Sequence, residues 1–184
     1  MGFAIADEFV VMGADVTLIT GPTAQTSKQH VNRIDVTTAA EMLQACEINY
    51  TNADVCVMSA AVADYTPVDP SPEKIKKQNG SLNIELKSTI DILKTLGQKK
   101  RDGQLLVGFA LETNDEEQNA ILKLKKKNLD FIVLNSLNDA GAGFKSNTNK
   151  ITIIDHNLNK TTFDLKTKDE VARDICQKVA ELIK

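Results

Sequence analysis

The stretch QLLVGFA, residues 104–110, decides the fold of this chain. From Leu105 to Ala110 it contains no polar side chain, so apolar and polar residues do not alternate. A strand buried on both faces reads in this way, whereas a strand with one face in water alternates. Three other stretches contain near-continuous apolar runs: DVTLIT at 15–20, DVCVMSA at 54–60 and DFIVLN at 130–135. Together they predict parallel strands that are covered by helices on both faces.

Helical segments separate these strands. We expect helices over residues 38–47, 89–100, 115–128 and 168–184. Capping-box spacing marks three of the helix starts: Thr38 with Glu41, Thr113 with Glu116, and Thr167 with Glu170. We also expect a strand at 82–87 and a hairpin formed by 150–156 and 160–166. The pattern predicts an α/β fold with three layers: a doubly wound, mostly parallel, Rossmann-like sheet with a C-terminal antiparallel hairpin.

The first residues, MGFAIADEFVVMG, predict a helix that ends at Gly13. In a doubly wound sheet, a strand and a glycine-rich turn come before such a helix. We therefore expect a single nucleotide-binding domain over residues 1–184 that lacks its first strand and glycine-rich loop. Part of the ligand site would belong to that turn.

Composition and cysteine usage argue against several classes of protein. The net charge is -3 and tryptophan is absent, which argues against nucleic-acid binding. No apolar run reaches the length of a membrane span, and no signal peptide follows Met1. Cys46, Cys56 and Cys176 are odd in number and far apart, as expected for buried thiols in a reducing cytoplasm. We expect a cytoplasmic protein without nucleic-acid or membrane partners.

The ends of the predicted strands are the expected ligand site, because open α/β sheets bind ligands beyond the carboxyl ends of their strands. The strand at 54–60 runs into AAVADYTPVDPSPEKIKK, residues 60–77. Small side chains at 60–63 would let a ligand approach the backbone, and Asp64 could accept hydrogen bonds from a ribose or an exocyclic amine. The alternative is that the alanines pack against a helix while Asp64 caps a turn. Another predicted strand ends at Asn135.

Lysines provide candidate contacts for phosphates. Lys74 follows a loop stiffened by prolines, which suits a cationic lid. Lys123 and Lys127 are four residues apart and share one face of a predicted helix. The alternative for Lys74 is a solvated surface loop. The alternative for Lys123 and Lys127 is a solvated helix face, and the residues alone favour that interpretation.

Five blocks of the chain, in order, resemble bacterial phosphopantothenoylcysteine synthetase. They are MGFAIADEF…GADVTLITGP at 1–22, RIDVTTAAEM at 33–42, AAVADYTP…PEKIKK at 60–77, LVGFALETN at 106–114 and KNLDFIVLNS at 127–136. The form AVADY at 61–65 is similar to the CTP-using bacterial type rather than the ATP-using animal type. Two departures stand out: Ile90 replaces a usual proline in KSTIDIL, and Asn147 stands where an acid is common in FKSNTN. The family's Asn-x-Ser-Ser-Gly-Lys loop is absent.

The resemblance implies a phosphopantothenate–cysteine ligase of coenzyme A biosynthesis. The carboxylate of 4′-phosphopantothenate would attack the α-phosphate of CTP to give an acyl cytidylate and pyrophosphate, and the amine of L-cysteine would then release CMP. Mg²⁺ would accompany the phosphates, with unknown protein ligands. The resemblance assigns to the nucleotide site Met58, Ser59, Ala60, Asp64, Lys74, Lys87, Ser88, Thr89, Ile90, Phe109, Lys123 and Lys127, with Lys74 also catalytic.

The resemblance also implies a homodimer, and the 150–166 hairpin could extend a sheet across its subunits. It is also compatible with a flavin-dependent decarboxylase that is fused to this chain or associated with it. Two other classes stay open on the residues alone. One is a nicotinamide- or flavin-binding oxidoreductase, although no GxGxxG motif occurs in the chain. The other is a non-catalytic nucleotide-binding fragment.

Overall fold

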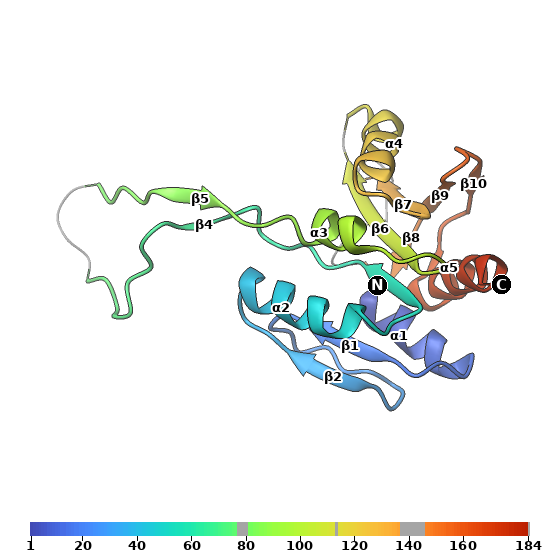
Figure 1. Cartoon of the computed structure of the whole chain (residues 1–184), viewed down its shortest axis with the longest axis horizontal. Coiled ribbons are helices and arrows are strands. Elements are labelled where there is room, and N and C mark those ends of the chain that lie inside the picture. The colour runs from blue at the N-terminus through green and yellow to red at the C-terminus, as the bar shows by residue number, and fades with distance from the viewer. Residues whose placement is uncertain (77–80, 113, 137–145, 184) are drawn as a thin grey trace.

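A mixed five-stranded sheet forms the centre of the molecule (Figure 1). The structure, a computed structural model, describes residues 1–76, 81–112, 114–136 and 146–183. The strands lie in the order β10-β9-β7-β6-β3. Their bounds are Val55–Met58 for β3, Leu105–Glu112 for β6, Phe131–Ser136 for β7, Ile151–Asp155 for β9 and Lys160–Thr162 for β10. Strands β3, β6 and β7 are parallel, whereas β9 and β10 run antiparallel to their neighbours.

Helices cover both faces of this sheet, as the apolar strands predicted. Helices α1 (Gly2–Val11) and α5 (Lys168–Leu182) pack on one face. Helices α2 (Ala39–Tyr50), α3 (Ile92–Lys99) and α4 (Glu116–Lys126) pack on the other. Successive residues of β6 point to opposite sides, so Leu106 joins the core beneath α3 and α4 while Val107 joins the core beneath α1 and α5. The three-layer α/β prediction is therefore confirmed.

The sheet is mixed rather than mostly parallel. The predicted C-terminal hairpin does form, but β9 pairs with β7 and so adds two antiparallel strands to the central sheet. The strand expected at 15–20 also forms, as β1 (Thr17–Thr20), yet it pairs with β2 (Asn32–Asp35) in a separate parallel pair. Strand β2 was not expected. It has only four residues with charges among them, so it shows no apolar run.

The helix starts and ends mostly follow the capping patterns. The Thr38 and Thr167 hydroxyls accept hydrogen bonds from the third residue of their helices, and both capping boxes are complete. Gly13 ends α1 with a φ of 91°, a conformation that glycine adopts readily. Helix α4 instead has Asp115 at its N-cap, and the Thr113 of the expected box lies outside the described residues.

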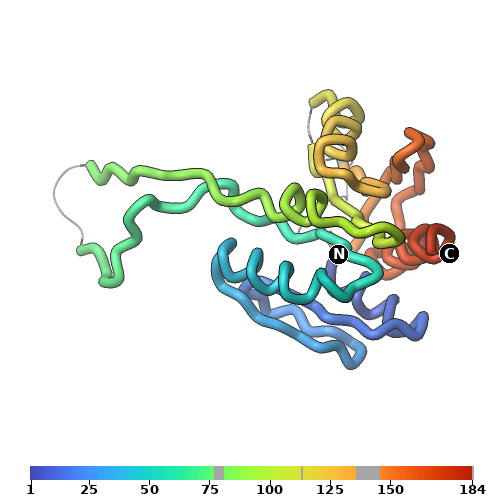
Figure 2. The backbone as a smooth tube through the Cα atoms, in the orientation of Figure 1, coloured from blue at the N-terminus to red at the C-terminus, as the bar shows by residue number. Residues whose placement is uncertain are grey.

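Residues 65–76 and 81–88 form a long arm that leaves the body, as Figure 2 shows. Its base is an antiparallel pair of β4 (Tyr65–Pro67) and β5 (Leu86–Ser88). Of the strand expected at 82–87, only residues 86 and 87 belong to β5, and Glu85 accepts one further hydrogen bond across the arm, from Val68 N–H at 3.0 Å. Apolar side chains on the arm are exposed, among them Ile75 (59%), Leu82 (66%) and Ile84 (58%).

A short antiparallel pair precedes α5. Strands β8 (Thr148–Asn149) and β11 (Lys166–Thr167) were not predicted, since two polar residues carry no periodicity. Among the residues that the structure describes, no helix is long and apolar enough to cross a membrane.

Candidate functional site

A cavity of about 510 Å³ lies at the carboxyl ends of β3 and β6. Its size is within the usual range for small-molecule sites. The loop after β3 forms one wall (residues 58–64), and the segment leading into α3 forms another (residues 89–93). The end of β6 and the inner face of α4 complete it. This is the edge of the sheet at which the sequence predicted a ligand.

Most of the expected nucleotide-site residues line this cavity. They are Met58, Ser59, Ala60, Asp64, Thr89, Ile90, Phe109, Lys123 and Lys127. Three expected residues do not line it. Lys87 and Ser88 belong to β5 and are exposed, and Lys74 is exposed on the arm. A role for these three in nucleotide binding stays a prediction.

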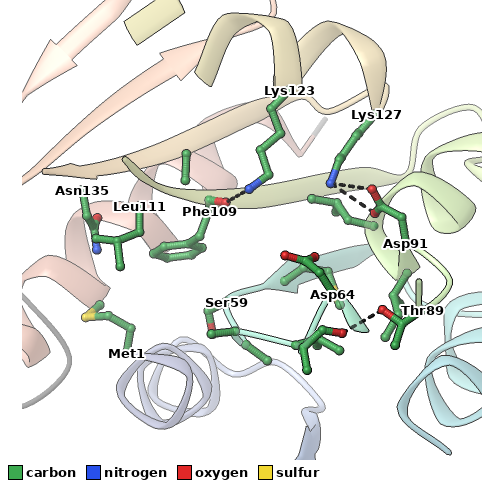
Figure 3. A pocket seen from close by; sticks show the side chains of 18 of the residues that line it. Met1, Ser59, Asp64, Thr89, Asp91, Phe109, Leu111, Lys123, Lys127 and Asn135 are labelled. Carbon is green, nitrogen blue, oxygen red and sulfur yellow. Dashed lines mark hydrogen bonds and ion pairs between the residues drawn. The ribbon is translucent and has the colours of Figure 1, made fainter. Parts of the chain in front are cut away.

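Backbone and hydroxyl contacts hold the loop after β3 in place. Thr89 N–H donates to the Asp64 carbonyl at 2.8 Å, and the Thr89 hydroxyl donates to the Ala63 carbonyl at 2.7 Å (Figure 3). On the other side, α1 begins so close that a Cβ at Gly2 would lie 2.8 Å from the Ser59 hydroxyl. The loop is therefore pinned between α1 and the start of α3, with its small side chains in the cavity wall.

The Asp64 carboxylate is exposed, and it accepts no hydrogen bond from any residue in the described ranges. The turn-capping alternative for this side chain thus finds no support, because only the backbone carbonyl of Asp64 is hydrogen-bonded. Its carboxylate lines the cavity, and its charge favours the protonated form of Lys123.

Lys123 and Lys127 are not on a solvated helix face. Lys123 Nζ donates to the Phe109 carbonyl at 2.9 Å, which brings the ammonium to the carboxyl end of β6. Burial, followed by repulsion from Lys127, lowers the pKa of Lys123. Lys127 is 16% exposed, and its Nζ lies 2.8 Å from Asp91 Oδ2. The interpretation favoured by the residues alone was wrong because α4 packs this face against the sheet edge.

Asp91 is a site residue that the sequence reasoning did not assign. It caps α3 by accepting from Lys94 N–H at 3.0 Å and also pairs with Lys127. Burial alone would raise the pKa of Asp91, but the hydrogen bonds from Lys127 and Lys94 hold it below its ordinary value. We expected this helix to begin at residue 89, but it begins at Ile92, so Asp91 is its N-cap and does not lie inside it.

The cavity also reaches residues from distant parts of the chain: Met1, Asn135, Asn149 and Lys168. Of these, only Asn135 stood at a strand end that the sequence marked. Asn149 lies in β8 and Lys168 begins α5, and no pattern connects either to the strands at 54–60 and 104–110.

The thiols and acidic groups limit the chemistry available. Burial raises the pKa of Cys46 to about 11, of Cys56 to about 12 and of Cys176 to about 12, so none is a thiolate at neutral pH. Within the described ranges, no three His, Cys, Asp or Glu residues are grouped to hold a metal ion. None of these thiols lines the cavity, whose lining offers cations, carboxylates and backbone groups that can position a ligand.

Comparison with known proteins gives a consistent family. Residues 1–183 match the model of the DNA/pantothenate metabolism flavoprotein C-terminal domain. A prokaryotic relative named cysteine/cysteine sulfinic acid decarboxylase is 53% identical over 100% of this chain and 51% of its own length. The coenzyme A biosynthesis bifunctional protein CoaBC of Bacillus subtilis (strain 168) is 44% identical, over 100% of this chain and 45% of its own length. The chain therefore spans about half the length of these curated relatives.

Solved structures agree. The crystal structure of the C-terminal domain of a CoaBC protein superposes with a TM-score of 0.80 at 39% identity, over 97% of this chain and 79% of that one. A DNA/pantothenate metabolism flavoprotein from Streptococcus pneumoniae has the same fold, with a TM-score of 0.82 at 22% identity over 97% of this chain and 86% of that one. The resemblance found in the five sequence blocks is confirmed, and the chain belongs to the DNA/pantothenate metabolism flavoprotein C-terminal domain family, the phosphopantothenoylcysteine synthetase half of CoaBC proteins.

Proposed function

We propose that this chain is a phosphopantothenate–cysteine ligase domain of coenzyme A biosynthesis. The carboxylate of 4′-phosphopantothenate attacks the α-phosphate of CTP, which forms an acyl cytidylate and expels pyrophosphate. The amine of L-cysteine then attacks the acyl carbon, forms the amide and expels CMP. The observation that carries the proposal is that Lys123 and Lys127 are half-buried and line the same cavity as the loop at 58–64, in a chain of this family.

The loop after β3 suits a nucleoside. The small side chains of residues 60–63 leave backbone groups accessible from the cavity. The loop is held between α1 and Thr89, so its backbone donors and acceptors are fixed in position. Fixed donors and acceptors can select the hydrogen-bonding edge of cytosine over that of a purine, and Asp64 lines the cavity where it could accept from the ribose or the base.

The two lysines suit the phosphates. An oxyanion beside Lys123 would favour its charged form, against the burial that lowers its pKa. The ion pair with Asp91 already orients the Lys127 side chain before a phosphate binds. No covalent enzyme intermediate is required, and catalysis would rest on positioning and charge stabilisation.

Mg²⁺ fits the donors that are present. This ion is usually held by one or two carboxylates together with substrate phosphates rather than by an all-protein cage. Asp64 offers a carboxylate at the cavity that accepts no hydrogen bond within the described ranges. When bound, Mg²⁺ would neutralise phosphate charge.

The arm bears on the catalytic role expected of Lys74 and on the homodimer. Lys74 is exposed on the arm, so it reaches a cavity only if the arm folds over or belongs to a second copy.

For the homodimer, the edge strand β10 is short and polar, which protects an edge from pairing. The exposed Ile75, Leu82 and Ile84 make the arm the better dimer surface. A flavin-dependent decarboxylase, fused or associated, is a further proposed partner in the cytoplasm.

The direct test uses the full natural polypeptide with CTP, 4′-phosphopantothenate, L-cysteine and Mg²⁺. Mass spectrometry should detect phosphopantothenoylcysteine and CMP in equal amounts, dependent on all three substrates. Calorimetric titration with NADPH measures binding of a nicotinamide cofactor and so tests the alternative oxidoreductase class. Tight NADPH binding without ligation would support the oxidoreductase class, and CTP binding without turnover would support a non-catalytic fragment.

A further inference from the structure

Helix α4 ends against the side of α3, and Gly97 is the residue of α3 at the point of contact. Gly97 is buried, and a Cβ added to it would lie 2.0 Å from the carbonyl oxygen of Lys127 and 2.9 Å from its carbonyl carbon. A Cβ does not come so close to backbone atoms, so any other residue at 97 would push the end of α4 away from α3. The backbone position of Lys127 therefore depends on the absence of a side chain at Gly97.

The end of α4 is a Schellman motif that has asparagine where glycine is usual. Asn128 N–H donates to the Lys125 carbonyl at 3.3 Å, and Leu129 N–H donates to the Leu124 carbonyl at 3.0 Å. Asn128 has a φ of 54°, in the left-handed region. Leu124 and Leu129 both join the core beneath α3 and α4, which is the apolar contact that accompanies this motif. The chain thus turns out of α4 directly after Lys127.

The Asn128 side chain adds a contact that glycine would lack. Its Nδ2 donates to the Gly97 carbonyl at 3.0 Å. Glycine adopts a left-handed φ more readily than asparagine does, so the turn by itself would favour glycine at this position. Two features therefore join the helices: the space at Gly97 for the Lys127 carbonyl, and the hydrogen bond from Asn128. We call them together the Gly97–Asn128 contact.

This contact decides where the Lys127 ammonium lies. Lys127 Nζ lies 2.8 Å from Asp91 Oδ2 (Figure 3). Asp91 is the N-cap of α3, and the helix rises about 9 Å from there to Gly97. Lys127 thus meets α3 at two points, with its carbonyl beside Gly97 and its ammonium beside Asp91. Because Lys127 lines the cavity, a shift of the end of α4 would move a cation of the cavity wall.

We propose that Gly97 and Asn128 are positioning residues for the outer phosphates of CTP, because they hold the Lys127 ammonium at the cavity. This inference rests on the proposed function, in which Lys127 contacts those phosphates. Neither Gly97 nor Asn128 lines the cavity, so both act through Lys127. A cation that is fixed before the nucleotide arrives loses less freedom on binding than a mobile one, and the affinity for phosphate is higher as a result.

The test measures the affinities of three single variants for CTP and CMP, by calorimetry on the full natural polypeptide. Gly97→Ala inserts the Cβ, and Asn128→Gly removes the amide while keeping the left-handed turn. Gln98→Ala is the matched control, because Gln98 is the next residue of α3, is exposed and does not line the cavity. Gly97→Ala should weaken CTP binding about tenfold, as expected for the loss of one lysine contact, and Asn128→Gly about threefold. CMP binding should change less than about twofold in every variant, because CMP lacks the outer phosphates.

Two further measurements separate positioning from a general loss of stability. Lys127→Gln alone should weaken CTP binding about tenfold, and combining it with Gly97→Ala should weaken CTP binding no further. Alanine normally stabilises a helix interior relative to glycine, so a lower melting temperature in Gly97→Ala but not in Gln98→Ala would report the contact with α4. If Gly97→Ala does not fold, Asn128→Gly combined with Lys127→Gln completes the same comparison.

Three results would overturn the inference. If Gly97→Ala and Asn128→Gly bind CTP like Gln98→Ala, the contact does not position Lys127, although the ligase function stands. Equal losses for CTP and CMP, or losses that add to that of Lys127→Gln, would show that the two residues act independently of this lysine. If Lys127→Gln binds CTP like the natural protein, the phosphate contact and the inference fail together. Absence of ligation product from the natural protein would instead refute the proposed function.

Discussion

Replacing both Lys123 and Lys127 by glutamine should distinguish contacts to the outer phosphates of CTP from contacts to its nucleoside. The double variant keeps side-chain length and polarity but removes two ammonium groups from the cavity wall. CTP should lose much more affinity than CMP, since CMP lacks the β- and γ-phosphates that the lysines are proposed to contact.

The structure sets the magnitude. A hydrogen bond to a charged group contributes about 1.5–3 kcal/mol. Lys127 is already paired with Asp91 at 2.8 Å, and Lys123 already donates to the Phe109 carbonyl, so each gains less from a phosphate than a free cation would. We therefore take the lower value for each, and the sum of about 3 kcal/mol corresponds to a loss of roughly a hundredfold for CTP.

The assay is calorimetric titration of CTP and CMP into the full natural polypeptide. Lys125 and Lys126 lie on the same helix and are exposed, so the Lys125→Gln, Lys126→Gln double variant changes the net charge equally. It should alter CTP affinity less than about threefold, because exposed charges are screened. Equal losses for CTP and CMP, or equal losses in the two double variants, would refute the reasoning.

Four more predictions follow from the same cavity. Asp64→Asn should weaken CTP about fivefold without lowering the melting temperature, because the carboxylate accepts no hydrogen bond within the described residues; a sharp melting loss with unchanged affinity would make Asp64 structural. Lys74→Gln should slow pyrophosphate release about a hundredfold, and Lys76→Gln much less; equal effects would remove the lid mechanism. Calorimetry should show CTP binding at least about tenfold more tightly than ATP, and equal affinities would contradict selection by the backbone at 59–61. Finally, the pKa of Asp91 is lowered in the fold, so its stabilising contribution is complete above the unfolded value of about 3.9 and is lost as the pH falls through the folded pKa. The difference in unfolding free energy between the natural protein and Asp91→Asn should therefore shrink below about pH 4, and a difference that grows on acidification would show the sign to be wrong.

Local sequence determined the elements of the core. Apolar runs at 54–60, 104–110 and 130–135 became β3, β6 and β7, because a strand covered on both faces must be apolar throughout. Capping threonines placed the starts of α2 and α5 for an equally local reason, since the cap bonds a backbone group three residues away. The helical period also placed Lys123 and Lys127 on one face.

Only the tertiary structure decided how those elements meet. The hairpin pairs with β7, and β1 pairs with β2 outside the central sheet. Strand partners depend on contacts between distant segments, so the local pattern does not determine them. The same holds for the cavity. Packing of α4 against the sheet edge buried two lysines that the residues alone favoured as solvated, and it placed Asp91 against Lys127. Asn135, Asn149 and Lys168 lie on separate elements and meet in one cavity only through the fold, since no sequence period spans those separations.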